Sequence, residues 1–186
     1  MSATILRHAD LSTDSDAVTA LMSDYLSWAV GRLREEYGVE DSPTDLSAIR
    51  ESLPSFVPPK GLLIVAERDG EPVGVAALRT LTPEMAEVKR MYVDPRGRGL
   101  GLGAALLDRL LTEAHGTLGA TTIRLDTCRF MTDAQRLYLS RGFVERGPYE
   151  ETEIPAHMRQ HWRFFERDLH SAPTDARPAI PLSPME

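Results

Sequence analysis

Four glycines stand within seven residues, at Gly97, Gly99, Gly101 and Gly103. Glycine adopts positive φ angles easily and lets a ligand approach the backbone closely. The glycines lie between a predicted strand and a predicted helix, and the N–H groups that begin a helix attract anions. Arg96 and Arg98 add cationic donors in the same loop. The loop therefore predicts a site for a phosphate or pyrophosphate group.

Two known phosphate loops fit this segment poorly, and a third interpretation needs no ligand. A P-loop requires lysine and then serine or threonine after its last glycine, but Ala104 and Ala105 follow Gly103. A dinucleotide-binding loop follows the first strand of its fold, whereas this loop follows the fourth predicted strand. A glycine-rich turn that only packs a strand against a helix stays an alternative.

The residues around the loop resemble a known family. Residues 98–103, Arg-Gly-Leu-Gly-Leu-Gly, fit the pattern [RQ]-x-x-G-x-[GA] of the GNAT family of N-acetyltransferases, and residues 91–95 and 104–107 are also similar. Residues 133–143 resemble that family's second motif, Asn-x-x-[AR]-x-x-x-Tyr-x-x-x-Gly-Phe, with Asp133 where asparagine is common. The resemblance extends over nearly all of residues 3–169.

The resemblance implies that acetyl-CoA is the co-substrate, and the single cysteine and scattered histidines predict no metal site. The family holds the CoA pyrophosphate with the loop and pairs the preceding strand with the pantetheine arm. The acyl group would lie where the strands at residues 85–93 and 121–126 splay apart, with a backbone N–H of the first strand stabilising the oxyanion. The implied cofactor-binding residues are Met91, Tyr92, Val93, Arg96, Arg98, Gly99, Leu100, Gly101, Leu102, Gly103, Ala104 and Asp133.

Acyl transfer to an amine needs a base and an acid. An amine with a pKa near ~10 is protonated at neutral pH, and the CoA thiolate leaves better when it is protonated. Tyr138, at the motif tyrosine, is the predicted acid, and a core tyrosine is the alternative. Glu87 is the candidate base, acting through water, unless it only pairs with Lys89 or Arg79. Asp126 is a second candidate base.

We therefore expect an N-acetyltransferase that acts by direct transfer on the amine of a small-molecule acceptor. The alternatives are a non-catalytic acyl-CoA-binding module that senses or regulates and, less favoured, a nucleotide-binding protein. Residues 20–60 and 145–163 would build the acceptor pocket. The acidic run at 149–153 would attract a cationic amine, or it is a solvated loop. Dimers are common in the family, so the resemblance makes a homodimer a candidate oligomeric state.

Composition excludes several other classes. The 186 residues carry a formal net charge of −7, which argues against a nucleic-acid or anionic-membrane partner. Around the glycine loop the local charge is positive, which predicts one anion site. The single acid there is Asp94, and the cations are Lys89, Arg90, Arg96 and Arg98. Cys128 is the single cysteine, so no internal disulfide can form, and a packed thiol is expected. The histidines, including the pair His157 and His161, lack the pattern of a zinc site. No secretory signal or membrane span is evident, which predicts a soluble cytoplasmic protein.

The periodicity of apolar residues predicts one α/β domain over residues 3–170, followed by a flexible proline-rich tail at 171–186. We expect a mixed, mostly antiparallel sheet with a splayed parallel pair of central strands, flanked by helices. Strands are predicted at 4–8, 62–66, 72–81, 85–93, 121–126, 143–145 and 162–169, and helices at 12–36, 42–53, 101–115 and 132–142. Ser42 and Thr132 are the expected caps of their helices, the latter in a capping box with Gln135. The prolines at 54–59 predict an extended connector that ends at Gly61.

Overall fold

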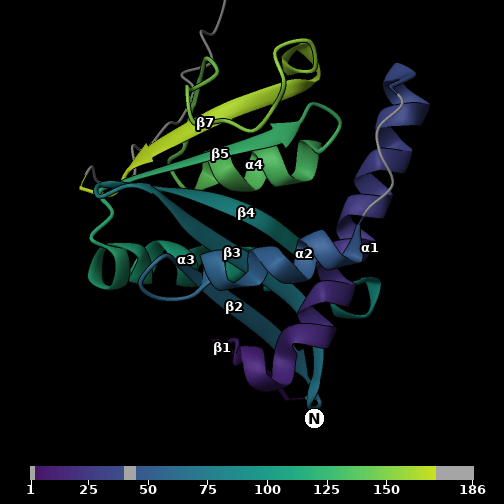
Figure 1. Ribbon diagram of the computed structural model, residues 1–186, viewed down its shortest axis with the longest axis vertical. Helices are drawn as coiled ribbons and strands as arrows, with labels where there is room; N and C mark the ends of the chain where they lie inside the picture. The colour runs from purple at the N-terminus through teal and green to yellow at the C-terminus, as the bar shows by residue number, and fades with distance from the viewer. Residues whose placement is uncertain (1–2, 40–44, 171–186) are drawn as a thin grey trace, which may run out of the picture.

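Seven strands form one open sheet, in the order β1-β2-β3-β4-β5-β7-β6, in the computed structural model, which describes residues 3–39 and 45–170 (Figure 1). All neighbouring pairs are antiparallel except β4 and β5, which are parallel. The expected α/β class is therefore confirmed. The strands are β1 Thr4–His8, β2 Gly61–Arg68, β3 Glu71–Thr82, β4 Met85–Val93, β5 Thr122–Cys128, β6 Val144–Arg146 and β7 Trp162–Asp168.

Helices cover both faces of the sheet. Helices α1 (Leu11–Tyr37) and α2 (Leu46–Ser52) pack on one face, and α3 (Leu102–Leu118) and α4 (Thr132–Ser140) on the other. Along β3, Val75 and Ala77 face the first pair, and Ala76 and Leu78 face the second, as the two-residue period of a strand requires. Short 3-10 helices lie at Leu53–Phe56, Pro95–Gly97 and Arg159–His161. None of the described helices is long and apolar enough to cross a membrane.

Strands β4 and β5 stay paired for only a short distance. Parallel pairing extends from Met85 opposite Thr122 to Glu87 opposite Arg124, and beyond this point the two strands diverge (Figure 1). A bulge follows in β4, where the two residues Arg90 and Met91 stand opposite one residue of β3. Bulges bend a strand and increase its twist. The gap between the two strands, which the sequence predicted, is thus present.

Two local expectations were wrong. Residues 53–56 form a 3-10 helix instead of an extended connector, because Leu53 and Phe56 are buried in the core and this packing overrides the preference of proline-rich sequence. Thr132 is the first helical residue of α4 and forms no side-chain cap, so the capping box is absent. Gln135 instead donates its amide to the carbonyl oxygens of Cys128 (2.9 Å) and Arg129 (3.1 Å), which ties α4 to the end of β5.

Two other helix ends also differ from expectation. Asp45 caps α2 by accepting a hydrogen bond from Ser47, so the helix begins at Leu46. The expected cap at Ser42 and Pro43 lies outside the described residues. Helix α3 continues through Gly116 and ends before Gly119, which has a positive φ of 69°. The tail at 171–186 also lies outside the described residues.

Candidate active site

A cavity of about 230 Å³ lies where β4 and β5 separate. Helix α1 contributes an apolar wall, since its pocket residues recur at the spacing of one helix face. Strands β4 and β5 contribute charged side chains, and α4 contributes Tyr138. The lining residues used below are Tyr25, Leu26, Ala29, Leu33, Lys89, Arg90, Met91, Asp126, Cys128, Met131, Ala134, Tyr138, Glu153 and Trp162.

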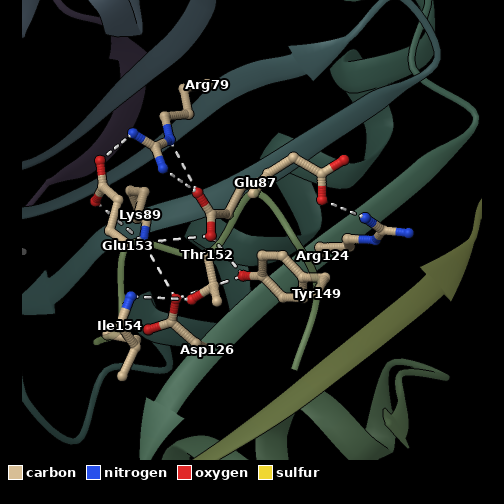
Figure 2. A network of polar contacts seen from close by, with 10 residues as sticks. Arg79, Glu87, Lys89, Arg124, Asp126, Tyr149, Thr152, Glu153 and Ile154 are labelled. Carbon is tan, nitrogen blue, oxygen red and sulfur yellow. Dashed lines mark hydrogen bonds and ion pairs between the residues drawn. The ribbon is translucent and has the colours of Figure 1, made fainter. Parts of the chain in front are cut away.

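Glu87, the candidate base, is fully buried beside this cavity and is not one of its lining residues. Figure 2 shows three side chains converging on its carboxylate. Arg79 donates from Nε at 2.9 Å, Lys89 lies 3.3 Å away, and the hydroxyl of Tyr149 donates at 2.5 Å. Both carboxylate oxygens are therefore occupied by donors from protein. The role of Glu87 as a base stays a prediction, and its geometry is that of the centre of a buried ionic network.

Asp126 is better placed to meet an acceptor, because it lines the cavity directly. Its side chain is 10% exposed, and Lys89 donates to its Oδ2 at 3.2 Å. The hydroxyl of Tyr149 lies 3.4 Å from the same oxygen, so this tyrosine stands between the two candidate bases. Burial, and then the charges of Asp126 and Glu87, raise the pKa of Tyr149, which keeps its phenol protonated.

Tyr138, the predicted acid, reaches the same cavity from α4. Its ring packs against Phe143 and Phe165, and its hydroxyl forms no hydrogen bond within the described part of the chain. Burial, and then the charge of Asp126, raise its pKa, so the phenol keeps its proton at neutral pH. Cys128 is buried, and burial raises the pKa of its thiol to about 12, so the thiol packs and is not a nucleophile.

A second cavity of about 250 Å³ lies along β4 beyond the bulge. Several predicted cofactor residues line it, namely Met91, Tyr92, Val93, Arg98 and Asp133. The two cavities share Tyr25, Met91, Met131 and Ala134, so they adjoin at the point where the sheet opens. The arrangement provides a groove along β4 beyond the bulge and an adjoining chamber of similar volume at the opening.

The glycine loop meets this cavity through Arg98, and none of its glycines is a lining residue. Gly99 and Gly101 have φ angles of +76° and +72°, which side chains with a Cβ rarely adopt. Gly101 begins α3 without a side-chain cap, so the first N–H groups of the helix have no side-chain acceptor. These groups include those of Leu102, Gly103 and Ala104. Leu100 is an exposed residue of the same turn.

The single basic cluster expected from the sequence is divided by the fold. Lys89 faces the carboxylates of Glu87, Asp126 and Glu153 at 3.2 to 3.5 Å, inside the sheet gap. Arg96 pairs with Asp94 at 2.8 Å. Only Arg98 belongs to the groove. The cations are divided because the bulge in β4 and the turn after it change the direction of the chain between them.

The acidic run at 149–153 is not a free solvated loop. Tyr149 is buried, Glu151 binds Arg124 at 2.9 Å, and Glu153 pairs with Arg79 and Lys89. Tyr149 is the functional candidate that sequence reasoning missed, since it was only one member of a broad acceptor segment. Residues two apart in β4 share a face, so Glu87 and Lys89 were expected together, but no local pattern identified Tyr149 as a partner of Glu87.

The comparison with known proteins agrees with this geometry. Residues 19–143 match the Acetyltransferase (GNAT) family. The chain belongs to the GNAT family. An uncharacterised N-acetyltransferase of Schizosaccharomyces pombe is 30% identical over 148 residues, which cover 78% of this chain and 85% of the yeast protein. An IAA acetyltransferase of Azospirillum brasilense is 36% identical over 98 residues, which cover 52% of this chain and 63% of that protein.

Solved structures of GNAT proteins share the fold. An acetyltransferase of Streptococcus agalactiae superposes with a TM-score of 0.69 at 19% identity, covering 89% of this chain and 98% of the other. A Salmonella typhimurium structure described as an acetyltransferase with its cofactor acetyl-CoA gives a TM-score of 0.63 at 21% identity, covering 93% and 99%. This GNAT chain therefore shares the fold of these proteins over most of its length.

Proposed function

We propose that this GNAT protein transfers the acetyl group of acetyl-CoA to the amine of a small-molecule acceptor. The observation that carries the proposal is the junction of two cavities at the opening between β4 and β5. The groove along β4 suits the pantetheine arm, and the uncapped start of α3 suits the pyrophosphate. The Salmonella relative named with acetyl-CoA supports the choice of donor. The chamber of about 230 Å³ favours a small acceptor.

The residues of the chamber support a direct transfer. Acetyl-CoA, when bound, supplies an acetyl group activated as a thioester. Asp126 is placed to accept the proton that the acceptor ammonium must lose before its nitrogen can attack the carbonyl carbon. Tyr138 keeps its proton and can give it to the sulfur as the carbon–sulfur bond breaks. Backbone N–H groups of β4 near the bulge are available for the oxyanion.

The test is release of the CoA thiol from acetyl-CoA in the presence of a panel of amines. Removing a general acid typically costs a factor of 10² to 10⁴, so Tyr138→Phe is expected to lower kcat about a hundredfold. Tyr37→Phe is the matched control, because Tyr37 stacks on His161 and is not a residue of either cavity. CoA binding without turnover of any amine would instead support an acyl-CoA-binding module. Binding of ATP but not CoA would support a nucleotide-binding protein.

Two broader expectations stay predictions. The fold itself carries no information about a cytoplasmic location, which cell fractionation tests. A homodimer is tested by light scattering of the purified chain.

A further inference from the structure

Arg90 differs from its cationic neighbours in its contacts with the described residues. Arg79 and Lys89 each contact at least two carboxylates. Arg90 forms no hydrogen bond or ion pair within residues 3–39 and 45–170, and its Nε is buried without an acceptor. A buried donor left unsatisfied costs about 1–3 kcal/mol. Native proteins seldom keep such a donor unless an acceptor from outside the protein satisfies its hydrogen bond.

The backbone at Arg90 is strained as well. Arg90 is the extra residue of the β4 bulge and has a positive φ of 55°. This conformation costs roughly 1–3 kcal/mol for a residue other than glycine. Met91, the next residue, packs against the core on the α3 face, so the bulge lets Arg90 depart from the usual alternation of side chains. The strain therefore places a cation in the opening of the sheet.

The cation lies on the side of the acceptor chamber. Arg90 lines the cavity of about 230 Å³. Glu153 is another residue of that cavity, and its pKa is lowered. Burial by itself would raise this pKa, but the interactions with Lys89, Arg79 and Arg90 outweigh burial. The same chamber therefore offers an unpaired guanidinium from β4 and carboxylates at Asp126 and Glu153.

An acceptor that satisfies all of these groups carries two charges. Its ammonium group would lie near Asp126, and an anionic group would lie on Arg90, since guanidinium binds carboxylates in a fork of two hydrogen bonds. The remaining wall comes from α1 and is apolar, with Leu26, Ala29 and Leu33. A phosphate monoester would also bind a guanidinium, but a second ionic wall would then be expected in place of the apolar one.

We propose that Arg90 binds the carboxylate of the acceptor, and that the acceptor is an amino acid with an apolar side chain. This inference rests on the proposed acetyl transfer. It assigns one charge of the substrate to each side of the chamber and the side chain to α1. Arg90 is a binding residue and takes no part in proton transfer.

Matched acceptors test the proposal. L-Leucine, L-leucinamide and 3-methylbutylamine share an amine and an apolar group, and only leucine has the carboxylate. We expect kcat/KM for leucine to exceed that for the other two by about ten- to a hundredfold, the range of a hydrogen-bonded ion pair. Arg90→Gln should remove this preference mainly through KM, and Arg90→Lys should restore part of it. Arg109→Gln, which removes an exposed arginine of α3, is the control.

A structural role for Arg90 would give a different result. Because Arg90 forms no hydrogen bond or ion pair with the residues that the structure describes, Arg90→Gln should leave the melting temperature and CoA affinity unchanged or slightly improved. Loss of folding in both Arg90→Gln and Arg90→Lys would overturn the proposal, as would equal turnover of leucine and 3-methylbutylamine, or a preference for O-phosphoethanolamine. In the last two cases acetyl transfer itself would stand.

A binding measurement covers the case in which no amine is acetylated. Leucine is then titrated calorimetrically into the protein saturated with CoA. Binding that is at least tenfold weaker in Arg90→Gln supports the carboxylate site even if the proposed transfer fails. Equal binding, or no binding, in wild type and variant overturns it.

Discussion

Replacing Glu87 by glutamine tests whether this residue holds the sheet together at its opening. The carboxylate is fully buried and accepts from Arg79, Lys89 and Tyr149. Glutamine keeps one acceptor oxygen but turns the other position into an N–H₂ donor, which then faces a donor from the protein. Arg79 and Lys89 also lose the buried one of the two carboxylates that they share, and the exposed Glu153 remains. Breaking a buried ionic network by removing one partner typically costs 3–5 kcal/mol.

The expected loss is large enough to measure easily. For a chain of this size, a loss of about 3–5 kcal/mol lowers the melting temperature by on the order of 10 °C. Urea unfolding followed by circular dichroism gives the free energy of unfolding directly. Glu150→Gln is the control, because Glu150 is exposed, and it should change stability by less than about 0.5 kcal/mol.

A second substitution separates the electrostatic cause from a packing defect. If an unbalanced cation causes the damage, adding Arg79→Gln to Glu87→Gln should cost less than the sum of the two single changes. A loss below about 1 kcal/mol for Glu87→Gln, with additive effects in the double variant, would refute the reasoning. If such a stable variant also lost the base-dependent limb of its pH–rate profile, Glu87 would be the base after all.

Two further predictions concern the loop and the N-terminal helix. Gly101→Ala meets no atom within 4 Å, so only its positive φ is strained, and we expect a loss of about 1–2 kcal/mol together with weaker CoA binding in a calorimetric titration. Gly103→Ala, at a position without positive φ, should change neither. Asp14 accepts hydrogen bonds from Arg7 (2.6 and 2.9 Å), which hold the pKa of its buried carboxyl below the ordinary value. Its stabilisation is therefore present at pH 7 and lost as pH falls through the lowered pKa. Asp14→Asn should be about 1–3 kcal/mol less stable at pH 7, and the gap should shrink below about pH 4 in urea unfolding; a gap that persists at pH 2 would contradict the ionic origin.

The strands, the helices and the glycine loop were predictable because each depends on residues close in sequence. Apolar residues at two- or four-residue spacing mark the elements, and the sheet alternation at β3 follows directly from them. The positive φ angles at Gly99 and Gly101 express a preference of the residue itself. Local patterns failed where packing competed with them, as at Phe56, whose burial shortens the proline-rich connector into a 3-10 helix.

The ionic network at the opening depends on contacts that no local pattern contains. Tyr149 reaches Glu87 across 62 residues of sequence, and Lys89 meets Asp126 across 37. The sequence by itself determined that a glycine-rich loop, a candidate acid and several carboxylates were present. Only the tertiary structure decided which carboxylate is enclosed by cations, which one lines the chamber, and that the buried Nε of Arg90 has no acceptor among the described residues. The physical reason is that a buried charge is governed by the groups that fold around it, and these come from four separate strands and loops.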